Sequence, residues 1–472
     1  MSRARGVRQE IVQQEIERFL DIRPVQIAEL ELDEGGVLRP GPGSPPVTHG
    51  EVFVLVRMGG RPVGTLLGHV PEGADPKAVL RGLAAREEAF SAGPARLPGP
   101  VPVPSTTVVV ATRERVEKLA HALDSLLAQD HPDFEIVVVD NAPVTDATRD
   151  LIEHKYAERV RYVTEPVPGL AVAHNKGVEA AHGEVTAFTD DDVVADPRWL
   201  TELTAPFTAD PRLGCATGLI LPARLRTPAQ VLLESHGGFA KGFTARTYDP
   251  QDPPADEPLF PFTAGRFGSG ASMAFRTEVL RAVGGFDPAT GAGTLARGGD
   301  DLYGFVRVLA EGHRLHYTPQ ALVWHHHRET WRDLETQAYG YGAGLTAYLT
   351  AILVNRPGLL PAFLARLPRG LAYARTLTAS REAEAGTASR AVSGAGAGTA
   401  SGAGAEAATR AGDVSGQAGG VCGRAGGAPG GHDDRTHAWP GRLSRLQRRG
   451  MLYGPVGYLR ARRALRLRGA AR

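Results

Sequence analysis

Apolar and polar positions along the middle of this chain alternate with the periods of strands and helices. Short apolar runs, typical of buried strands, occupy residues 107–111, 134–140, 160–164 and 185–188. Amphipathic segments with helical spacing lie between them, at residues 115–128, 145–156 and 172–181. Buried strands that alternate with such helices predict an α/β domain with a mostly parallel sheet flanked by helices. Ligands of these sheets bind at the carboxyl ends of the strands, so polar residues there are candidates for function.

A different pattern precedes this domain and predicts a small α+β domain over residues 1–93. Two apolar strands on either side of the turn Gly59-Gly60 indicate a hairpin, and a helix is expected from Pro76 to Phe90. Residues 94–104 contain five prolines, which favours a semi-rigid linker. We therefore place the α/β domain at residues 105–350.

The C-terminal part of the chain changes composition twice. Residues 351–378 continue as a helical extension, and residues 379–440 are so rich in glycine and alanine that we expect a disordered tether. Residues 441–472 carry ten arginines and no acid, interleaved with apolar and aromatic residues. Such a basic amphipathic tail suits an anionic membrane surface. A solvated tail, or a helix that docks on the catalytic domain, is an equally open alternative.

Composition excludes some classes of protein. A net charge of +1 over 472 residues argues against nucleic-acid binding. The two cysteines, Cys215 and Cys422, cannot form a disulfide framework and fit a reducing cytoplasm. The N-terminus has no apolar signal-peptide core, and the apolar runs 345–354 and 359–364 are too short to span a bilayer. We therefore expect a cytoplasmic protein, with contact to the inner face of the cell membrane through the basic tail.

The most informative segment is Asp190-Asp191-Asp192, which follows directly on the apolar strand 185–188. Like charges this close repel each other unless their pKa values rise or a divalent cation neutralises them. Carboxylate oxygens suit Mg²⁺ or Mn²⁺, which complete their coordination with water and substrate phosphates. The alternative is an acidic turn that caps the helix expected near Pro197.

Seven segments stand in one characteristic order along the chain. They are Thr107–Arg113, Ile136–Asn141, Gly169–Gly177, Gly183–Asp192, Gly270–Arg276, Gly284–Asp287 and Gly298–Leu302. In this order the segments resemble the inverting family 2 glycosyltransferases, over about residues 105 to 350. The resemblance implies a soluble member of the family with the GT-A fold, a nucleotide-diphosphate-sugar donor and a divalent metal, Mn²⁺ or Mg²⁺.

The resemblance also assigns roles at the donor site. Asp140 resembles the acid that binds the nucleotide base, because a carboxylate accepts an imide N–H. Thr112 and Arg113 lie at the neighbouring strand end and could hold the nucleotide, although ordinary loop polarity is the alternative. Asn175 can bind ribose or phosphate. His174 stands before it in place of the family's usual arginine, which removes a permanent charge.

The metal site is expected at the family's D-x-D pattern. Asp190 and Asp192 are its outer acids, with Asp192 the direct ligand and Asp190 its partner, while Asp191 contacts the sugar or ribose of the donor. A histidine completes the metal site in several members of the family. His325 is our first candidate and His327 the second, since alternate residues of an extended segment share a face.

The catalytic base is expected at Asp301, which resembles the acid of the family's Glu-Asp pair. It would remove the proton from an acceptor hydroxyl, and its acidic neighbour Asp300 should raise the apparent pKa of the pair. Asp300 is also suited to cap the helix expected at 302–310. On the acceptor side we place Gly270, Ser272 and Asp300.

These assignments predict an inverting, metal-dependent glycosyltransferase that acts in cell-envelope, polysaccharide or glycolipid synthesis. Residues 337–342 depart from the Gln-x-x-Arg-Trp motif of processive synthases, which disfavours that class. A nucleotidyltransferase is one alternative, but residues 112–118 lack a glycine-rich phosphate loop. A non-catalytic, membrane-associated scaffold on a degenerate transferase domain is the other. The acceptor is not identified by the sequence.

Overall fold

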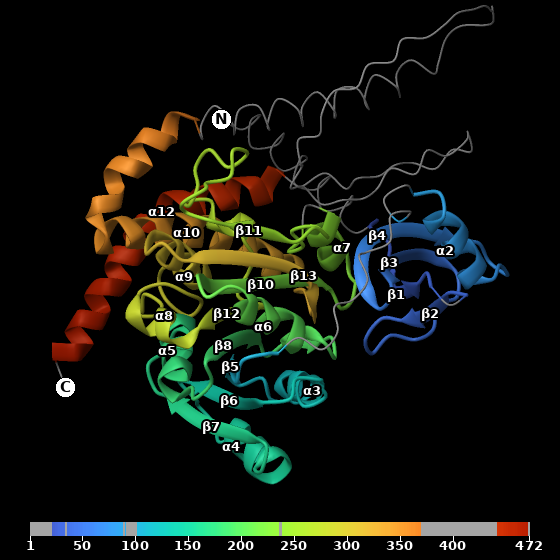
Figure 1. Ribbon diagram of the computed structural model, residues 1–472, viewed down its shortest axis with the longest axis horizontal. Helices are drawn as coiled ribbons and strands as arrows, with labels where there is room; N and C mark the ends of the chain where they lie inside the picture. Colours follow the sequence, from blue (N-terminus) through green and yellow to red (C-terminus); the bar gives the residue numbers. More distant parts are fainter. Residues whose placement is uncertain are drawn as a thin grey trace, which may run out of the picture.

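The computed structural model of this chain describes residues 21–33, 35–87, 90, 102–235, 238–369 and 441–470. The expected tether at 379–440 and the linker up to residue 101 lie outside the described residues. Two sheets lie side by side, a small one near the N-terminus and a larger one that carries the helices (Figure 1).

The N-terminal unit is a four-stranded sheet with the order β2-β1-β3-β4. Its elements are β1 Gln26–Glu31, β2 Val37–Pro40, β3 Gly50–Met58, β4 Arg61–Val70 and the helix α2 Pro76–Ala84. β3 and β4 form the hairpin at Gly59-Gly60, whereas the sequence pattern did not reveal β1 and β2. α2 ends at Ala84 and does not reach Phe90, whose ring instead fills the space above Gly64.

The larger sheet has nine strands in the order β11-β13-β10-β12-β8-β5-β6-β7, with β9 paired to β13. The strands are β5 Thr106–Thr112, β6 Phe134–Asn141, β7 Val160–Glu165, β8 Val185–Asp190, β9 Val193–Ala195, β10 Leu213–Pro222, β11 Arg246–Tyr248, β12 Met273–Arg276 and β13 Arg314–His325. Four adjacent strands are parallel to one another, in the order β8-β5-β6-β7. β12 runs antiparallel to both β8 and β10, so the sheet is mixed.

Helices cover both faces of this sheet. They are α3 Val116–Leu126, α4 Ala147–Leu151, α5 Leu170–Ala180, α6 Trp199–Ala209, α7 Pro228–Ser235, α8 Thr277–Ala282 and α9 Asp300–Ala310, and the π-helical turn η2 Ile152–Tyr156 extends α4. Successive residues of β5 face opposite sides, so Val108 packs with α3 and Val109 packs with α5. Burial on both sides explains why these strands are almost continuously apolar.

Strand register brings the polar strand ends together. Thr112 at the end of β5 is the partner of Asp140 in β6, and Ala111 is the partner of Asp190 in β8. The three carboxyl ends therefore lie next to one another at one edge of the sheet, as ligand sites of parallel sheets require.

Two long helices complete the catalytic domain. α10 spans Trp331–Asn355 and begins at Thr330, whose hydroxyl accepts a hydrogen bond from the Asp333 N–H. After the short turn η4 Pro357–Leu359, residues 360–369 are again helical. Among the described residues no single helix is long and apolar enough to cross a membrane. The helices Trp331–Asn355 and Pro357–Arg369 meet both criteria only as a pair, which is bent by 109°.

α12, Gly441–Ala470, docks alongside α10 (Figure 1). The approach is close because glycines face the partner helix: a Cβ at Gly450 or Gly454 would lie within 3.0 Å of α10 atoms. Leu443 and Tyr458 of α12 are fully buried, and the Tyr458 hydroxyl donates to Asp287 Oδ2 at 2.8 Å. Of the interpretations open for this tail, helix docking on the catalytic domain therefore holds for one face of α12.

Candidate functional site

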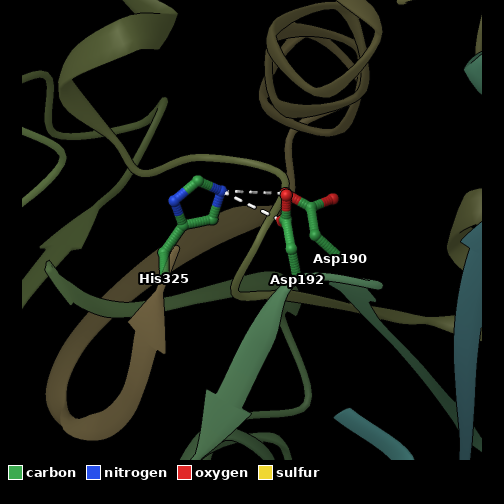
Figure 2. Close-up of side chains that lie close together, drawn as sticks. All are labelled: Asp190, Asp192 and His325. Atoms are coloured by element: carbon green, nitrogen blue, oxygen red, sulfur yellow. Dashed lines mark ion pairs between the residues drawn. The ribbon is translucent and has the colours of Figure 1, made fainter. Parts of the chain in front are cut away.

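Asp190, Asp192 and His325 form a compact group at the edge of the large sheet. Each offers a ligand atom, and these atoms lie within 4.8 Å of one another. His325 Nε2 is 3.3 Å from Asp192 Oδ1 and 3.9 Å from Asp190 Oδ2, and the imidazole points toward both carboxylates in Figure 2. One nitrogen and two carboxylates fit a divalent metal of the Mn²⁺ type.

The pairing of β9 with β13 creates this group. Val193, directly after the acidic segment, is the partner of His325 in the antiparallel ladder. The His326 N–H also donates to the Asp192 carbonyl oxygen at 3.0 Å. Two segments more than 130 residues apart in the sequence are thereby held together by main-chain hydrogen bonds. The acidic segment does not cap α6, whose N-cap is Arg198 without a side-chain bond.

The charges of this group separate the pKa values of its members. Burial raises the pKa of Asp190 to about 6, and the Asp192 charge adds to that rise. Burial also disfavours the charge of Asp192, but His325, Lys118 and Arg115 hold its pKa below the usual range. Asp192 in turn raises the pKa of His325 against the effect of burial. Asp192 is therefore the fully ionised carboxylate of the group.

Arg115 and Lys118, which the sequence analysis missed, supply positive charge beside the acids. Arg115 Nη1 lies 2.9 Å from Asp191 Oδ1 and 3.5 Å from Asp192 Oδ2. Lys118 Nζ lies 3.4 Å from Asp192 Oδ2. The two residues are three positions apart and therefore lie on one face of the first turn of α3. This spacing is the sequence signal that could have identified them. They neutralise part of the acidic charge within the protein itself.

Asp191 lies in the turn between β8 and β9, and it is not a member of the metal group. Its Oδ2 accepts a hydrogen bond from the Thr112 hydroxyl at 2.7 Å, and its Oδ1 pairs with Arg115. Burial raises the pKa of Asp191, and Arg115 opposes that rise. Asp191 thus ties β5 and α3 to the acidic segment. Its contact with sugar or ribose stays a prediction.

His327 shares a face with His325 as expected, but it is not part of the metal group. Its Nδ1 lies 3.2 Å from His325 Nδ1, and its Nε2 lies 3.0 Å from Glu234 Oε2 of α7. Both ring nitrogens therefore have partners within the protein, and the role of His327 as a metal ligand stays a prediction. Glu234 had no sequence signal, since only the tertiary fold brings α7 to this place.

Asp140 lies at the predicted position, at the end of β6. It is fully buried, its Oδ2 accepts from the Tyr162 hydroxyl at 2.9 Å, and its Oδ1 has no hydrogen-bond partner. Burial raises its pKa. A buried carboxylate oxygen without a donor can take an N–H from a ligand. Arg113 is exposed nearby, and its contact with the nucleotide, like that of Asp140, stays a prediction.

Asn175 has a structural role in the described fold. Its Oδ1 accepts from the Phe286 N–H at 2.9 Å and its Nδ2 donates to the Phe286 carbonyl oxygen at 2.8 Å. This pair of bonds ties α5 to the Gly284–Asp287 segment and leaves the amide little capacity for ribose or phosphate. The assignment of Asn175 to donor binding is therefore not supported.

Asp301 lies in the first turn of α9. Its Oδ2 accepts from the Gly270 N–H at 3.0 Å and its Oδ1 from the Leu302 N–H at 2.8 Å. Burial, and then the Asp300 charge, raise its pKa to about 6, with a smaller contribution from Asp190. A carboxylate with this pKa is mostly ionised at neutral pH and still basic enough to accept a proton. Burial lowers the pKa of Lys241, and the charge of Asp301 partly opposes this shift.

Asp300 and Ser272 contact other side chains within the protein, and their place on the acceptor side stays a prediction. Asp300 is buried with its Oδ2 3.2 Å from His174 Nδ1, in poor alignment for a hydrogen bond. It is also the first residue of α9 and not its cap, because Gly299 holds the N-cap position at a φ of 87°. Ser272 is fully buried and accepts from the Trp199 indole N–H at 3.0 Å. Gly270 donates its N–H to Asp301, and its place on the acceptor side stays a prediction.

Comparison with known proteins places these residues in a family. The family profile described as "Glycosyltransferase like family 2" matches residues 104–339. The chain is 26% identical over 265 residues to the pre-mycofactocin glycosyltransferase of Mycobacterium tuberculosis, covering 55% of this chain and 52% of that protein. It is 23% identical over 235 residues to the glucosyl-dolichyl phosphate glucuronosyltransferase of Haloferax volcanii, covering 47% of this chain and 68% of that protein. The chain thus spans about half the length of the mycobacterial relative.

Two solved structures are similar over part of the chain. A mannosyltransferase of Pyrobaculum calidifontis, in complex with GDP-Man and Mn²⁺, aligns with a TM-score of 0.39 and 23% identity over 65% of this chain and 87% of that chain. GalNAc-T7 with UDP, GalNAc and Mn²⁺ aligns with a TM-score of 0.38 and 19% identity over 54% of this chain and 51% of that chain. The family profile covers half of the sequence, from β5 into α10, and it includes every residue of the group described above. The chain therefore belongs to the family 2 glycosyltransferases, and its catalytic domain has the GT-A fold.

Proposed function

We propose that the protein transfers one sugar from a nucleotide-diphosphate-sugar to an acceptor hydroxyl, with inversion and with a divalent metal. The observation that carries the proposal is the group formed by Asp190, Asp192 and His325, whose ligand atoms lie within 4.8 Å of one another. Asp301 is near enough for the Asp190 charge to contribute to the rise of its pKa. A single-displacement reaction needs this arrangement, with a base for the acceptor on one side and charge stabilisation for the leaving group on the other.

Asp190, Asp192 and His325 would hold the metal, which fits their donor atoms. When bound, a divalent cation stabilises the charge that develops on a leaving nucleoside diphosphate. Arg115 and Lys118 lie beside the same carboxylates and can turn toward the donor's phosphates once those carboxylates are otherwise neutralised.

Asp301 acts on the acceptor. It takes the proton of the attacking hydroxyl as that oxygen forms its bond to the anomeric carbon, and the bond from that carbon to the diphosphate breaks. The Gly270 N–H holds Oδ2 in place, so the carboxylate is oriented before the acceptor arrives. General-base assistance of this kind contributes about 10² to 10⁴ in rate.

The test uses a panel of nucleotide-sugars with Mn²⁺. Donor binding to the full chain should raise its melting temperature by mass action, which identifies the sugar and the nucleotide. Release of nucleoside diphosphate is then measured for the wild type and for Asp301→Asn. We expect donor binding to persist in Asp301→Asn and release to fall by about 10² or more. Undiminished release in this variant would refute the assignment of the base.

We further propose an anionic membrane surface as a partner, reached through the outward face of α12. Leu452, Leu459 and Leu467 of this helix are exposed to 82%, 53% and 63%. Exposed arginines flank them, at positions 445, 448, 449, 460, 463 and 466, and the helix contains no acid. Apolar side chains surrounded by cations on one helix face match the chemistry of an anionic bilayer.

A lipid-linked acceptor would meet the enzyme at such a surface. The name of the haloarchaeal relative, a glucosyl-dolichyl phosphate glucuronosyltransferase, supports this direction. The proposal includes a place in cell-envelope or glycolipid synthesis on the inner face of the membrane. Co-sedimentation with phosphatidylglycerol vesicles tests it. Leu452→Ser with Leu459→Ser should abolish sedimentation, whereas Val144→Ser, at an equally exposed valine of the catalytic domain, should not. Equal sedimentation of the two variants would contradict the proposal.

A further inference from the structure

Four side chains form a continuous line from the acidic group into the protein interior. His325 Nε2 faces Asp192 Oδ1 at 3.3 Å, and His325 Nδ1 faces His327 Nδ1 at 3.2 Å. His327 Nε2 then faces Glu234 Oε2 at 3.0 Å. The His327 side chain is 1% exposed and the Glu234 side chain 15%. Water therefore has little access to the inner half of this line.

A metal at His325 Nε2 requires a free lone pair on that nitrogen, which fits one arrangement of protons along this line. The Glu234 carboxylate can only accept, so His327 Nε2 carries a proton. In a neutral His327 ring, the proton on Nε2 leaves a free lone pair on Nδ1. His325 Nδ1 must then donate to that lone pair. If His325 is neutral, its remaining lone pair is on Nε2, the atom that faces Asp190 and Asp192.

We propose that Glu234 and His327 are positioning residues that fix the tautomer and the ring orientation of His325 for metal binding. The inference rests on the metal site of the proposed function, and it gives a role to Glu234, which no motif marks. A metal-ligating imidazole needs a partner at its other nitrogen, which sets the tautomer and raises the basicity of the ligand. Here that partner is a second imidazole, which a carboxylate orients in its turn.

The surroundings hold this line rigidly. The Phe239 ring packs on both imidazoles, with centroids 5.3 Å from His325 and 5.4 Å from His327. Gln230 Nε2 of α7 donates to the His327 carbonyl oxygen at 3.2 Å. α7 therefore contacts His327 twice, through Gln230 at the main chain and through Glu234 at the ring. This double contact fixes the distance between the helix and the end of β13.

The first test measures Mn²⁺ binding to the full chain by calorimetry, with the metal alone. Glu234→Leu removes the acceptor and should weaken binding about 10- to 100-fold. Glu234→Gln, whose amide oxygen can still accept from His327 Nε2, should restore most of the affinity. The matched control is Glu202→Leu, which removes a similarly buried, ion-paired carboxylate of α6, 17% exposed, and should leave binding unchanged. Unchanged binding in a folded Glu234→Leu protein would overturn the proposal.

The second test does not depend on metal. ¹⁵N spectra of histidine-labelled, metal-free protein report which ring nitrogen carries the proton. We expect His327 as the Nε2–H tautomer in the wild type and a mixture of tautomers in Glu234→Leu. A wild-type His327 protonated on Nδ1 would refute the line of donors and acceptors. If the wild type binds no Mn²⁺ but His327 shows the expected tautomer, the proposed metal dependence fails while the positioning stands.

Discussion

Lys118 offers a test of how the protein balances charge around the acidic group. Its Nζ lies 3.4 Å from Asp192 Oδ2, and a metal at this carboxylate must compete with that ammonium. Lys118→Met keeps the apolar stem and removes the charge. We therefore expect the variant to bind Mn²⁺ more tightly than the wild type in the absence of nucleotide, which is the opposite of what a mutation in a binding site usually does.

The size of the effect follows from the geometry. For unit charges 3.4 Å apart, an effective dielectric constant of about 20 gives an attraction of about 5 kcal/mol. The Lys118 side chain is 46% exposed, and solvent screening reduces the measured strength of such pairs to about 1 kcal/mol. That free energy corresponds to about a fivefold gain in Mn²⁺ affinity.

Calorimetric titration of Mn²⁺ at low ionic strength measures this gain. A second titration, of nucleoside diphosphate into Mn²⁺-saturated protein, should show the reverse, with weaker binding in Lys118→Met because a cation beside the phosphates is lost. Lys176→Met is the control, since Lys176 pairs with Glu179 on α5, where its Nζ lies 2.9 Å from the carboxylate. If Lys118→Met binds Mn²⁺ more weakly than the wild type in the absence of nucleotide, the reasoning is refuted.

Three other predictions follow from contacts in the fold. The pKa of Asp301 is raised to about 6, and a protonated Asp301 cannot act as a base, so the rate of sugar transfer should fall by about tenfold per pH unit well below that value. A pH profile of the rate at saturating donor measures this fall, and a flat profile down to a pH of about 5 would contradict the role of Asp301. A Cβ at Gly454 would collide with Thr346 and Ala343 of α10, so Gly454→Leu should cost about 1–3 kcal/mol of stability and expose α12 to proteases, whereas Gly82→Leu, in open space, should not. Arg57 pairs with Glu29 and Asp196, each at 2.6 Å, so Arg57→Met should lower the free energy of unfolding by about 3 kcal/mol in a denaturant titration. A loss below about 0.5 kcal/mol would show that the Arg57–Asp196 pair does not hold the N-terminal sheet to the catalytic domain.

The carboxyl ends of the strands could be predicted because periodicity and burial are local properties. Asp140 and Asp190 each follow an apolar run, and parallel register then brings them to one edge of the sheet. The D-x-D pattern of the family that the chain resembles, and not periodicity, separated Asp190 and Asp192 from Asp191. The resemblance to a known family then directed attention to Asp301.

Motif position was a weaker guide to what each side chain contacts. Asn175, Ser272 and Asp300 stand inside family-like segments, yet each uses its polar atoms within the protein. Asn175 bonds the Phe286 main chain, Ser272 accepts from an indole and Asp300 lies against His174. A motif preserves the position of a residue in the chain, whereas the partners of its side chain depend on neighbours that arrive from distant segments.

By itself the sequence determined the family, the strand ends and the acidic segment, because hydrophobic period and motif order are written along the chain. Only the tertiary structure decided which groups meet. The pairing of β9 with β13 set His325 against Asp192, and α7 brought Glu234 to His327. The docking of α12 on α10 likewise depends on tertiary structure, because glycines on these two helices, which are far apart in the sequence, allow their backbones to approach closely. Long-range contacts of this kind depend on packing in three dimensions, for which no local pattern carries a signal.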